Sequence, residues 1–230
     1  MASSTGTLAL VGGAEWTEGC SFDRELLAAS GGTEVLVLPT AAAYERPERL
    51  VIAAAEWFSE LGAEVEGLMV LNRGDAEDRG AADIVRRARF VYFSGGSSLH
   101  LRSVLKGSAV FEALREAWED GAVVAGAGAG AMALTDPMVD PRGGALTVGL
   151  GLIEGMAVFT HYGDLVEDAH GEKLHRSVTL APEGLPVVGL PERTALIRDP
   201  SGTWQGWGAG QPAVFLDGKF AEGGVAKLLA

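Results

Sequence analysis

The residues best spaced for chemistry lie in a glycine-rich turn, Gly126-Ala127-Gly128-Ala129-Gly130. The turn matches the pattern G-x-nucleophile-x-G, in which small flanking residues let a strand bend sharply into a helix and expose one reactive side chain. Gly128 holds the central position, where acyl-transfer chemistry needs the oxygen of Ser or the sulfur of Cys. The spacing is that of a nucleophile elbow, but the nucleophile is absent.

Two other interpretations fit the same turn. Gly126, Gly128 and Ala131 match the dinucleotide fingerprint G-x-G-x-x-A, although this match follows the fifth expected strand rather than the first. No acidic residue closes the next strand, as ribose binding would require. The third interpretation is structural: a helix start packs closely on a sheet, so only small residues fit. The turn alone leaves the elbow and the close packing open.

Alternating strands and helices would position this turn. We expect strands at Leu8–Val11, Val35–Leu38, Val65–Leu71, Phe90–Phe93 and Ala122–Ala125, with helices at Phe22–Ala29, Pro47–Leu61, Ala81–Arg87, Leu99–Leu105 and Val110–Glu119. The strands are continuously apolar, which is typical of a parallel sheet covered on both faces. Right-handed crossovers then predict a doubly wound α/β fold, similar to flavodoxin.

The pattern changes after residue 135. Short strands are expected at Thr194–Arg198, Thr203–Trp207 and Ala213–Leu216, and we predict that they form an antiparallel extension on the edge of the same sheet. Trp204 and Trp207 are expected on one face of their strand. No linker-like stretch separates the two parts, so residues 1–230 are predicted to form a single domain.

Ligands of doubly wound sheets bind at the carboxyl ends of the strands, where the strand order reverses. The turns after the first, fourth and fifth strands are therefore the places to search. They contain Gly12-Gly13, Gly95-Gly96 and the turn at Gly128.

Composition excludes several function classes. The chain has 31 acidic and 18 basic residues among 230, a net charge of −13, which repels phosphate backbones and anionic lipid. We therefore expect no nucleic-acid partner and no membrane partner. Cys20 is the single cysteine, which excludes an intramolecular disulfide and a Cys-rich metal site, and no metal or cofactor is expected. No secretion signal or membrane-spanning run is recognised, so a cytoplasmic location is expected.

The glycine turns also carry a family resemblance. The segments Val11–Glu15, Leu36–Thr40, Phe93–Gly96 and the turn at Gly128 resemble, in order and spacing, the cyanophycinase and dipeptidase E family. Leu150–Gly155, Phe159–Tyr162 and Gly189–Leu196 continue the likeness, which runs from about residue 8 to residue 218. Members are serine peptidases with a class I glutamine amidotransferase-like fold, so the resemblance implies that fold here.

The resemblance also implies roles for individual residues. The family's nucleophilic serine falls on Gly128 and its histidine on His161, with Asp136 as the acidic partner and Asp140 as a competitor. The oxyanion hole would use backbone N–H groups near Gly96 and Ala129. Further candidates for the cleft are Glu15, Ser97, Ser98, Arg176 and Glu192. Ser97-Ser98 is a departure, because the family often has Asp-Gln there.

Three hypotheses for function follow. In the first, the chain is a non-hydrolytic relative whose cleft binds a peptide-like or amino-acid-like ligand. In the second, it is an active hydrolase that uses Ser97, Ser98 or a water activated by His161. In the third, Gly128 is an engineered replacement in a normally active serine peptidase. Assembly into a homo-oligomer stays open.

Overall fold

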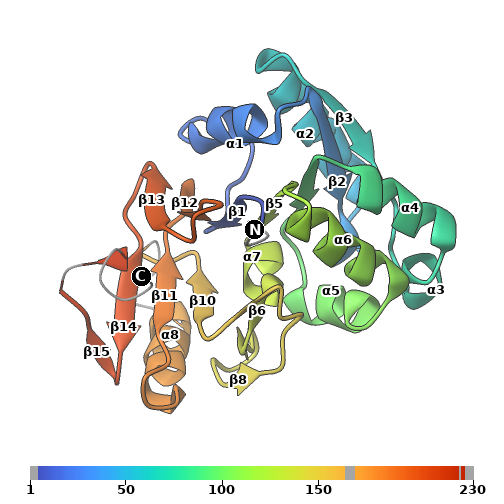
Figure 1. The fold of residues 1–230 in the computed structure, drawn as a ribbon. Helices are drawn as coiled ribbons and strands as arrows, with labels where there is room; N and C mark the ends of the chain where they lie inside the picture. The colour runs from blue at the N-terminus through green and yellow to red at the C-terminus, as the bar shows by residue number, and fades with distance from the viewer. Residues whose placement is uncertain (1–4, 164–168, 223, 226–230) are drawn as a thin grey trace.

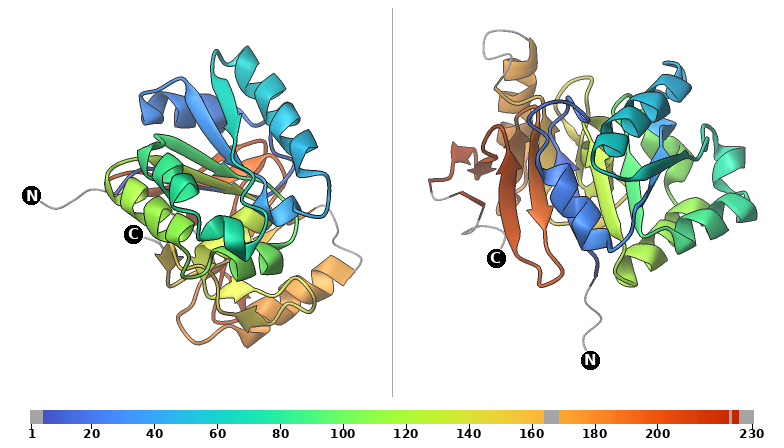
Figure 2. Two further views of the ribbon diagram at one scale, coloured as in Figure 1. Left: turned by 90° about the vertical axis from the view of Figure 1, so that its right-hand side faces the viewer. Right: turned by 90° about the horizontal axis from the view of Figure 1, so that it is seen from above.

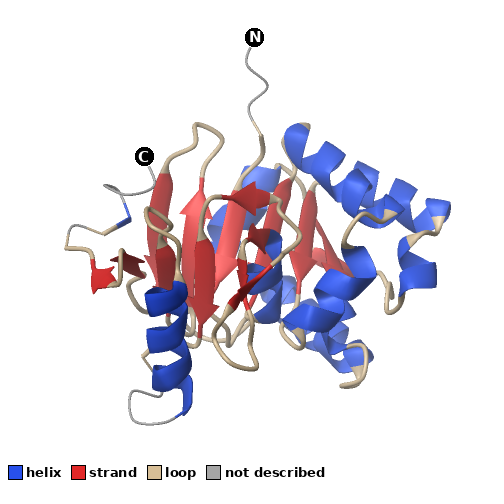
Figure 3. Ribbon diagram, turned by 90° about the horizontal axis from the view of Figure 1, so that it is seen from below, coloured by secondary structure: helices blue, strands red, loops and turns tan. Residues whose placement is uncertain are grey.

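Seven strands form one sheet through the middle of the molecule, with helices on both of its faces (Figures 1 and 3). The computed structural model describes residues 5–163, 169–222 and 224–225. The strands of this sheet are β1 (Leu8–Val11), β2 (Glu34–Leu38), β3 (Glu64–Gly67), β4 (Phe90–Phe93), β5 (Val123–Ala127), β12 (Thr194–Arg198) and β13 (Trp204–Gly208). Their order across the sheet is β13-β12-β1-β5-β4-β2-β3.

The five strands from β1 to β3 in this order run parallel, and β12 and β13 extend the sheet antiparallel beyond β1. The expected doubly wound, mostly parallel fold is confirmed. β1, β5 and β4 are direct neighbours, so the glycine turns that follow them meet at one end of the sheet. This adjacency builds the candidate site.

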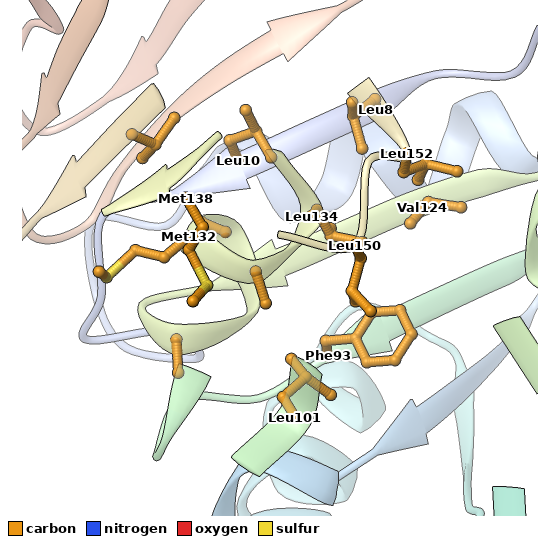
Figure 4. Packing of buried hydrophobic residues seen from close by; sticks show 14 of the residues in the cluster. Leu8, Leu10, Phe93, Leu101, Val124, Met132, Leu134, Met138, Leu150 and Leu152 are labelled. Atoms are coloured by element: carbon orange, nitrogen blue, oxygen red, sulfur yellow. The ribbon is translucent and has the colours of Figure 1, made fainter. Parts of the chain in front are cut away.

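The two faces of the sheet bury different helices, because successive strand residues point to opposite sides. The helices are α1 (Phe22–Ser30), α2 (Pro47–Glu60), α3 (Arg73–Ala76), α4 (Arg79–Arg87), α5 (Ser98–Leu105), α6 (Ala109–Glu119), α7 (Ala129–Leu134) and α8 (Ala169–Leu180), with a 3₁₀ turn at Thr40–Ala42. Helices α1 and α2 pack on the face that carries Tyr92, and α4 to α7 pack on the face that carries Phe93 (Figure 2). Figure 4 shows the second of these cores, where Leu8, Leu10 and Val124 of the strands meet Leu134 of α7.

A second sheet lies beside the first. It contains β10 (Ala157–Thr160), β11 (Val187–Leu190), β14 (Ala213–Leu216) and β15 (Lys219–Phe220), with β10 parallel to β11. Two small strand pairs, β6 (Thr135–Asp136) with β9 (Ile153–Glu154) and β7 (Met138–Val139) with β8 (Leu146–Thr147), connect α7 to it.

Two local expectations were wrong. The strand at Ala213–Leu216 does not extend the large sheet but pairs with β11, because the chain leaves the sheet through Pro212, which has no N–H to continue a ladder. Trp204 and Trp207 do not share a face: the first is 7% exposed and the second 41%. They are three residues apart, and an odd spacing puts strand side chains on opposite faces.

Candidate active site

The turn at Gly128 has the backbone shape of a nucleophile elbow. It joins β5 to α7, with φ of 50° and ψ of −108° at Gly128, a conformation that side chains of L-residues rarely adopt. Two hydrogen bonds fix the turn: the Gly128 N–H donates to the Val11 carbonyl at 2.9 Å, and the Met132 N–H donates to the Gly128 carbonyl at 3.1 Å. The strained shape is therefore held by the neighbouring strand and by the helix.

The three glycines of this turn differ in the space that surrounds a Cβ atom at each position. A Cβ on Gly126 would lie 2.7 Å from the Gly130 carbonyl carbon, and one on Gly130 would lie 2.8 Å from the Phe93 carbonyl oxygen. Those two positions need glycine because α7 packs directly on the strands, as the structural interpretation of the turn expects. A Cβ on Gly128 would meet only the His161 Nε2 atom at 3.6 Å and the Gly95 Cα atom at 3.7 Å. The nucleophile position thus has room for a side chain and faces the histidine.

His161 follows β10 and stands opposite the elbow. Its N–H donates to the Gly12 carbonyl at 2.9 Å, and its ring packs against the Cα of Gly13, where a Cβ would approach the ring to 2.4 Å. Its Nδ1 atom lies 3.0 Å from Oε1 of Glu192. A carboxylate only accepts, so in the neutral ring Nδ1 carries the proton and Nε2 presents its lone pair to Gly128. This is the orientation of a general base in a hydrolytic triad.

The acidic partner differs from the expectation. Asp136 does not contact His161: it accepts from the Gly149 N–H at 3.2 Å and lies 3.8 Å from the Lys106 ammonium. Asp140 is engaged by Arg142, whose hydrogen bonds hold the pKa of this carboxyl below its usual range. The partner is Glu192, named from the sequence only as a residue of the cleft. Its position directly after β11, which runs parallel to β10, is the signal that could have identified it.

Two residues were expected to supply the backbone N–H groups of an oxyanion hole. Gly96 and Ala129 both line the cleft beside His161. Among the described residues, no hydrogen bond uses the N–H of either one. They are free to donate to a ligand oxygen, but their role there stays a prediction.

The cleft itself has a volume of about 140 Å³ and is lined by both polar and apolar side chains. Its lining residues are Gly96, Ser98, Ala129, Met132, Val139, Asp140, Pro141, Phe159, Thr160, His161 and Lys173. Ser98 is 2% exposed, and its hydroxyl has no hydrogen-bond partner among the described residues. Ser97 instead caps α5, accepting from the His100 N–H at 3.3 Å.

Arg176 does not reach the cleft. It lies on an exposed part of α8, and Lys173, one turn earlier and not singled out from the sequence, lines the cleft instead.

A buried polar group lies behind the elbow, on the α1 side of the sheet. Glu15 accepts from the Gly95 N–H at 2.7 Å, and the Trp16 ring lies 5.2 Å from the Tyr92 ring at an interplanar angle of 59°. Burial raises the pKa of Asp23 to about 8, against a hydrogen bond from Trp57 that lowers it. Burial likewise raises the pKa of the Tyr92 hydroxyl well above its usual range. At neutral pH both groups are therefore uncharged.

Three other features of the described ranges concern metal binding, a second hollow and membrane spanning. No group of three or more His, Cys, Asp or Glu side chains there is arranged to hold a metal ion. A second hollow, of about 540 Å³, lies at the amino ends of β2 and β3, far along the strands from the glycine turns. None of the helices in these ranges has the length and apolar composition of a membrane span.

Known proteins resemble this chain in sequence and in fold. The family model of peptidase family S51 matches residues 8–203. Cyanophycinases of Synechococcus elongatus and Thermosynechococcus vestitus are each 25% identical over 221 residues, 91% of this chain and 67% of theirs. A solved peptidase from an acI-B1 Actinobacterium is 27% identical, with a TM-score of 0.83, covering 95% of this chain and 94% of the other.

A more distant likeness concerns the fold alone. A protein of Listeria monocytogenes EGD-e described as a peptidase E is 16% identical, with a TM-score of 0.68 over 90% of this chain and 100% of the other. The S51 match spans the elbow, His161 and Glu192. The chain belongs to peptidase family S51.

Proposed function

We propose that this chain is a non-hydrolytic member of its peptidase family, which binds a peptide-like or amino-acid-like ligand in the cleft at Gly128. The observation that carries the proposal is the contrast at the elbow. The strained turn and the His161–Glu192 pair are present, yet Gly128 has no side chain. The N–H groups of Gly96 and Ala129 have no partner among the described residues, which suits the binding of a ligand oxygen. An acyl-enzyme needs an oxygen or sulfur lone pair that a base can activate, and Ala127 and Ala129 offer none either.

The remaining groups suit binding rather than bond cleavage. The N–H groups of Gly96 and Ala129 can donate to a carbonyl or carboxylate oxygen, and the apolar lining can bury a short side chain. Oxyanion donors alone leave a residual rate of only about 10³–10⁴-fold over water when triad members are removed. A peptidase needs far more than that. A cytoplasmic location is part of the proposal. So is the absence of a nucleic-acid or membrane partner, which the net charge of −13 supports. A homo-oligomer stays a prediction.

One observation favours a second candidate, an active hydrolase with a displaced nucleophile. The Ser98 hydroxyl is buried, without a partner among the described residues, and lines the same cleft as His161. Ser97 is a weaker choice because its hydroxyl already caps α5. A water activated by His161 would need no serine nucleophile. If Gly128 is an engineered replacement, neither Ser97 nor Ser98 takes part in the reaction.

A fluorophosphonate probe separates these candidates. We expect no covalent adduct on the unmodified chain, measured by intact-protein mass spectrometry, because no serine is activated by His161. Ser98→Ala should behave like the unmodified chain. An adduct that maps to Ser98 by peptide mass spectrometry and disappears in Ser98→Ala would overturn the proposal in favour of the second candidate. Turnover of a dipeptide library that is lost in His161→Ala, without an adduct, would instead identify an activated water.

A further inference from the structure

Three successive backbone amides follow β4, and the two outer ones are fixed. The Gly95 N–H donates to Oε1 of Glu15 at 2.7 Å. The Ser97 N–H donates to the Ala41 carbonyl at 2.8 Å. Between them, Gly96 lines the cleft, and its N–H has no partner among the described residues. The direction of the Gly96 N–H is therefore set by the anchors on either side.

The packing around these amides leaves little freedom. Gly96 has φ of +133°, and a Cβ there would lie 2.5 Å from the Ala41 carbonyl oxygen. A Cβ on Gly95 would lie 3.1 Å from Oε1 of Glu15, so the carboxyl lies directly against this backbone. The Gly95 Cα atom is in turn 3.7 Å from the Cβ position of Gly128. Movement of Glu15 would thus change the distance between the Gly96 N–H and the elbow.

Glu15 belongs to the turn that also holds the histidine. Gly12 accepts from the His161 N–H at 2.9 Å, and Gly13 packs against the His161 ring. The turn is unusually shaped, since Ala14 and Trp16 have φ of 49° and 58°. The segment 12–15 therefore contacts both His161 and the Gly95 N–H, which precedes the proposed oxyanion donor.

The surroundings of Glu15 favour a stable hydrogen bond. Its acidic neighbour Asp23 is buried, and burial raises the pKa of Asp23 to about 8, so Asp23 is uncharged at neutral pH. Asp23 then adds no negative charge beside the carboxylate of Glu15. A hydrogen bond from an N–H to a carboxylate is roughly twice as strong as a neutral one.

We infer that Glu15 is a positioning residue, which acts through the Gly95 N–H to aim the Gly96 N–H at a carbonyl oxygen of the ligand. The inference rests on the proposed function, in which this cleft holds a peptide-like ligand. Glu15 is not among the residues that line the cleft, so its effect is transmitted by the hydrogen bond from the Gly95 N–H. Glu15 would thus orient the oxyanion donor, a role distinct from those of His161 and of the nucleophile position at Gly128.

The first arm of the test keeps Gly128 and changes only Glu15 or its control. Amide hydrogen exchange, followed by NMR, should show the Gly95 N–H losing protection by about tenfold or more in Glu15→Ala. Glu15→Gln keeps an acceptor oxygen without the charge, so an intermediate loss is expected. Glu18→Gln removes the same charge from an exposed position of the same turn and should change nothing. Unchanged protection at Gly95 in both Glu15 variants would overturn the inference.

The second arm uses Gly128→Ser, in which fluorophosphonate is expected to react with the introduced serine. Adding Glu15→Ala should lower the second-order labelling rate by about 10²-fold, as expected for one lost oxyanion donor, and Glu15→Gln should restore part of it. Equal rates with and without Glu15 would contradict the inference. If a folded Gly128→Ser is never labelled, the cleft has diverged beyond its nucleophile, and the exchange arm alone decides the role of Glu15. If Glu15→Ala does not fold, Glu15→Gln supplies both measurements.

Discussion

Gly128→Ser is expected to turn an unreactive protein into one that fluorophosphonate labels at residue 128. The Cβ position at Gly128 faces the Nε2 atom of His161 at 3.6 Å, with no other atom closer than the Gly95 Cα at 3.7 Å. A hydroxyl there comes within about 2.6–3.2 Å of Nε2, where the ring can take its proton. Intact-mass kinetics should give a labelling rate on the order of 10³-fold or more above the unmodified chain.

Two further variants control this experiment. Gly128→Ala adds the Cβ without the oxygen and should stay unlabelled. Gly128→Ser with His161→Ala should lose nearly all of the gain, because the serine then has no base. Both substitutions at Gly128 should cost about 1–3 kcal/mol of folding free energy, since a side chain at φ of +50° is strained. A folded Gly128→Ser protein without labelling would show that the cleft has diverged beyond its nucleophile.

Asp23→Asn is expected to stabilise the protein at alkaline pH. Folded Asp23 keeps its proton up to about pH 8, whereas in the unfolded chain the proton is lost near the ordinary value of 3.8. Between these values the folded state binds more protons, so the free energy of unfolding falls as pH rises from about 4 to about 8. Asn keeps an acceptor for the Trp57 N–H and does not ionise. At pH 8.5 the gain should be several kcal/mol, with roughly 6 kcal/mol as the upper end of a four-unit shift.

The stability gained in Asp23→Asn should depend on pH. Urea unfolding of both proteins should give free energies that differ by only about 1 kcal/mol at pH 4.5, less than one pH unit above the ordinary pKa of 3.8 that Asp23 has in the unfolded chain. The difference should then grow with pH and level off above about pH 8. Asp140→Asn is the contrasting variant, because the pKa of Asp140 is lowered and its exposed partner Arg142 contributes little. A difference between Asp23→Asn and the unmodified chain that does not change with pH would contradict the account.

Much of the large sheet was predictable from local sequence. Two strands have the predicted bounds, Leu8–Val11 and Phe90–Phe93. Each is an uninterrupted apolar run that is followed within two residues by a pair of glycines. The helix at Pro47–Glu60 begins where a proline favours the first turn. The elbow and His161 were identified by their motifs, and they do face each other.

The rest depended on pairings that no local pattern encodes. Glu192 reaches His161 only because β11 pairs in parallel with β10, which aligns residues about thirty positions apart. Asp136 was favoured because it lies close to the elbow in the chain, but the β6–β9 pair turns it toward Gly149. The second sheet was missed for the same reason, since β14 pairs with β11 rather than with its neighbour in sequence, β13.

The most direct test of the central claim, that this site lacks a nucleophile and is otherwise assembled, is a crystal structure of Gly128→Ser. The account predicts a backbone at residue 128 close to φ of 50° and ψ of −108°, with the His161–Glu192 contact kept near 3.0 Å. The distance to measure joins the new Oγ atom to Nε2 of His161, and it should be about 2.6–3.2 Å. A relaxed turn with the hydroxyl directed away from His161 would contradict the claim.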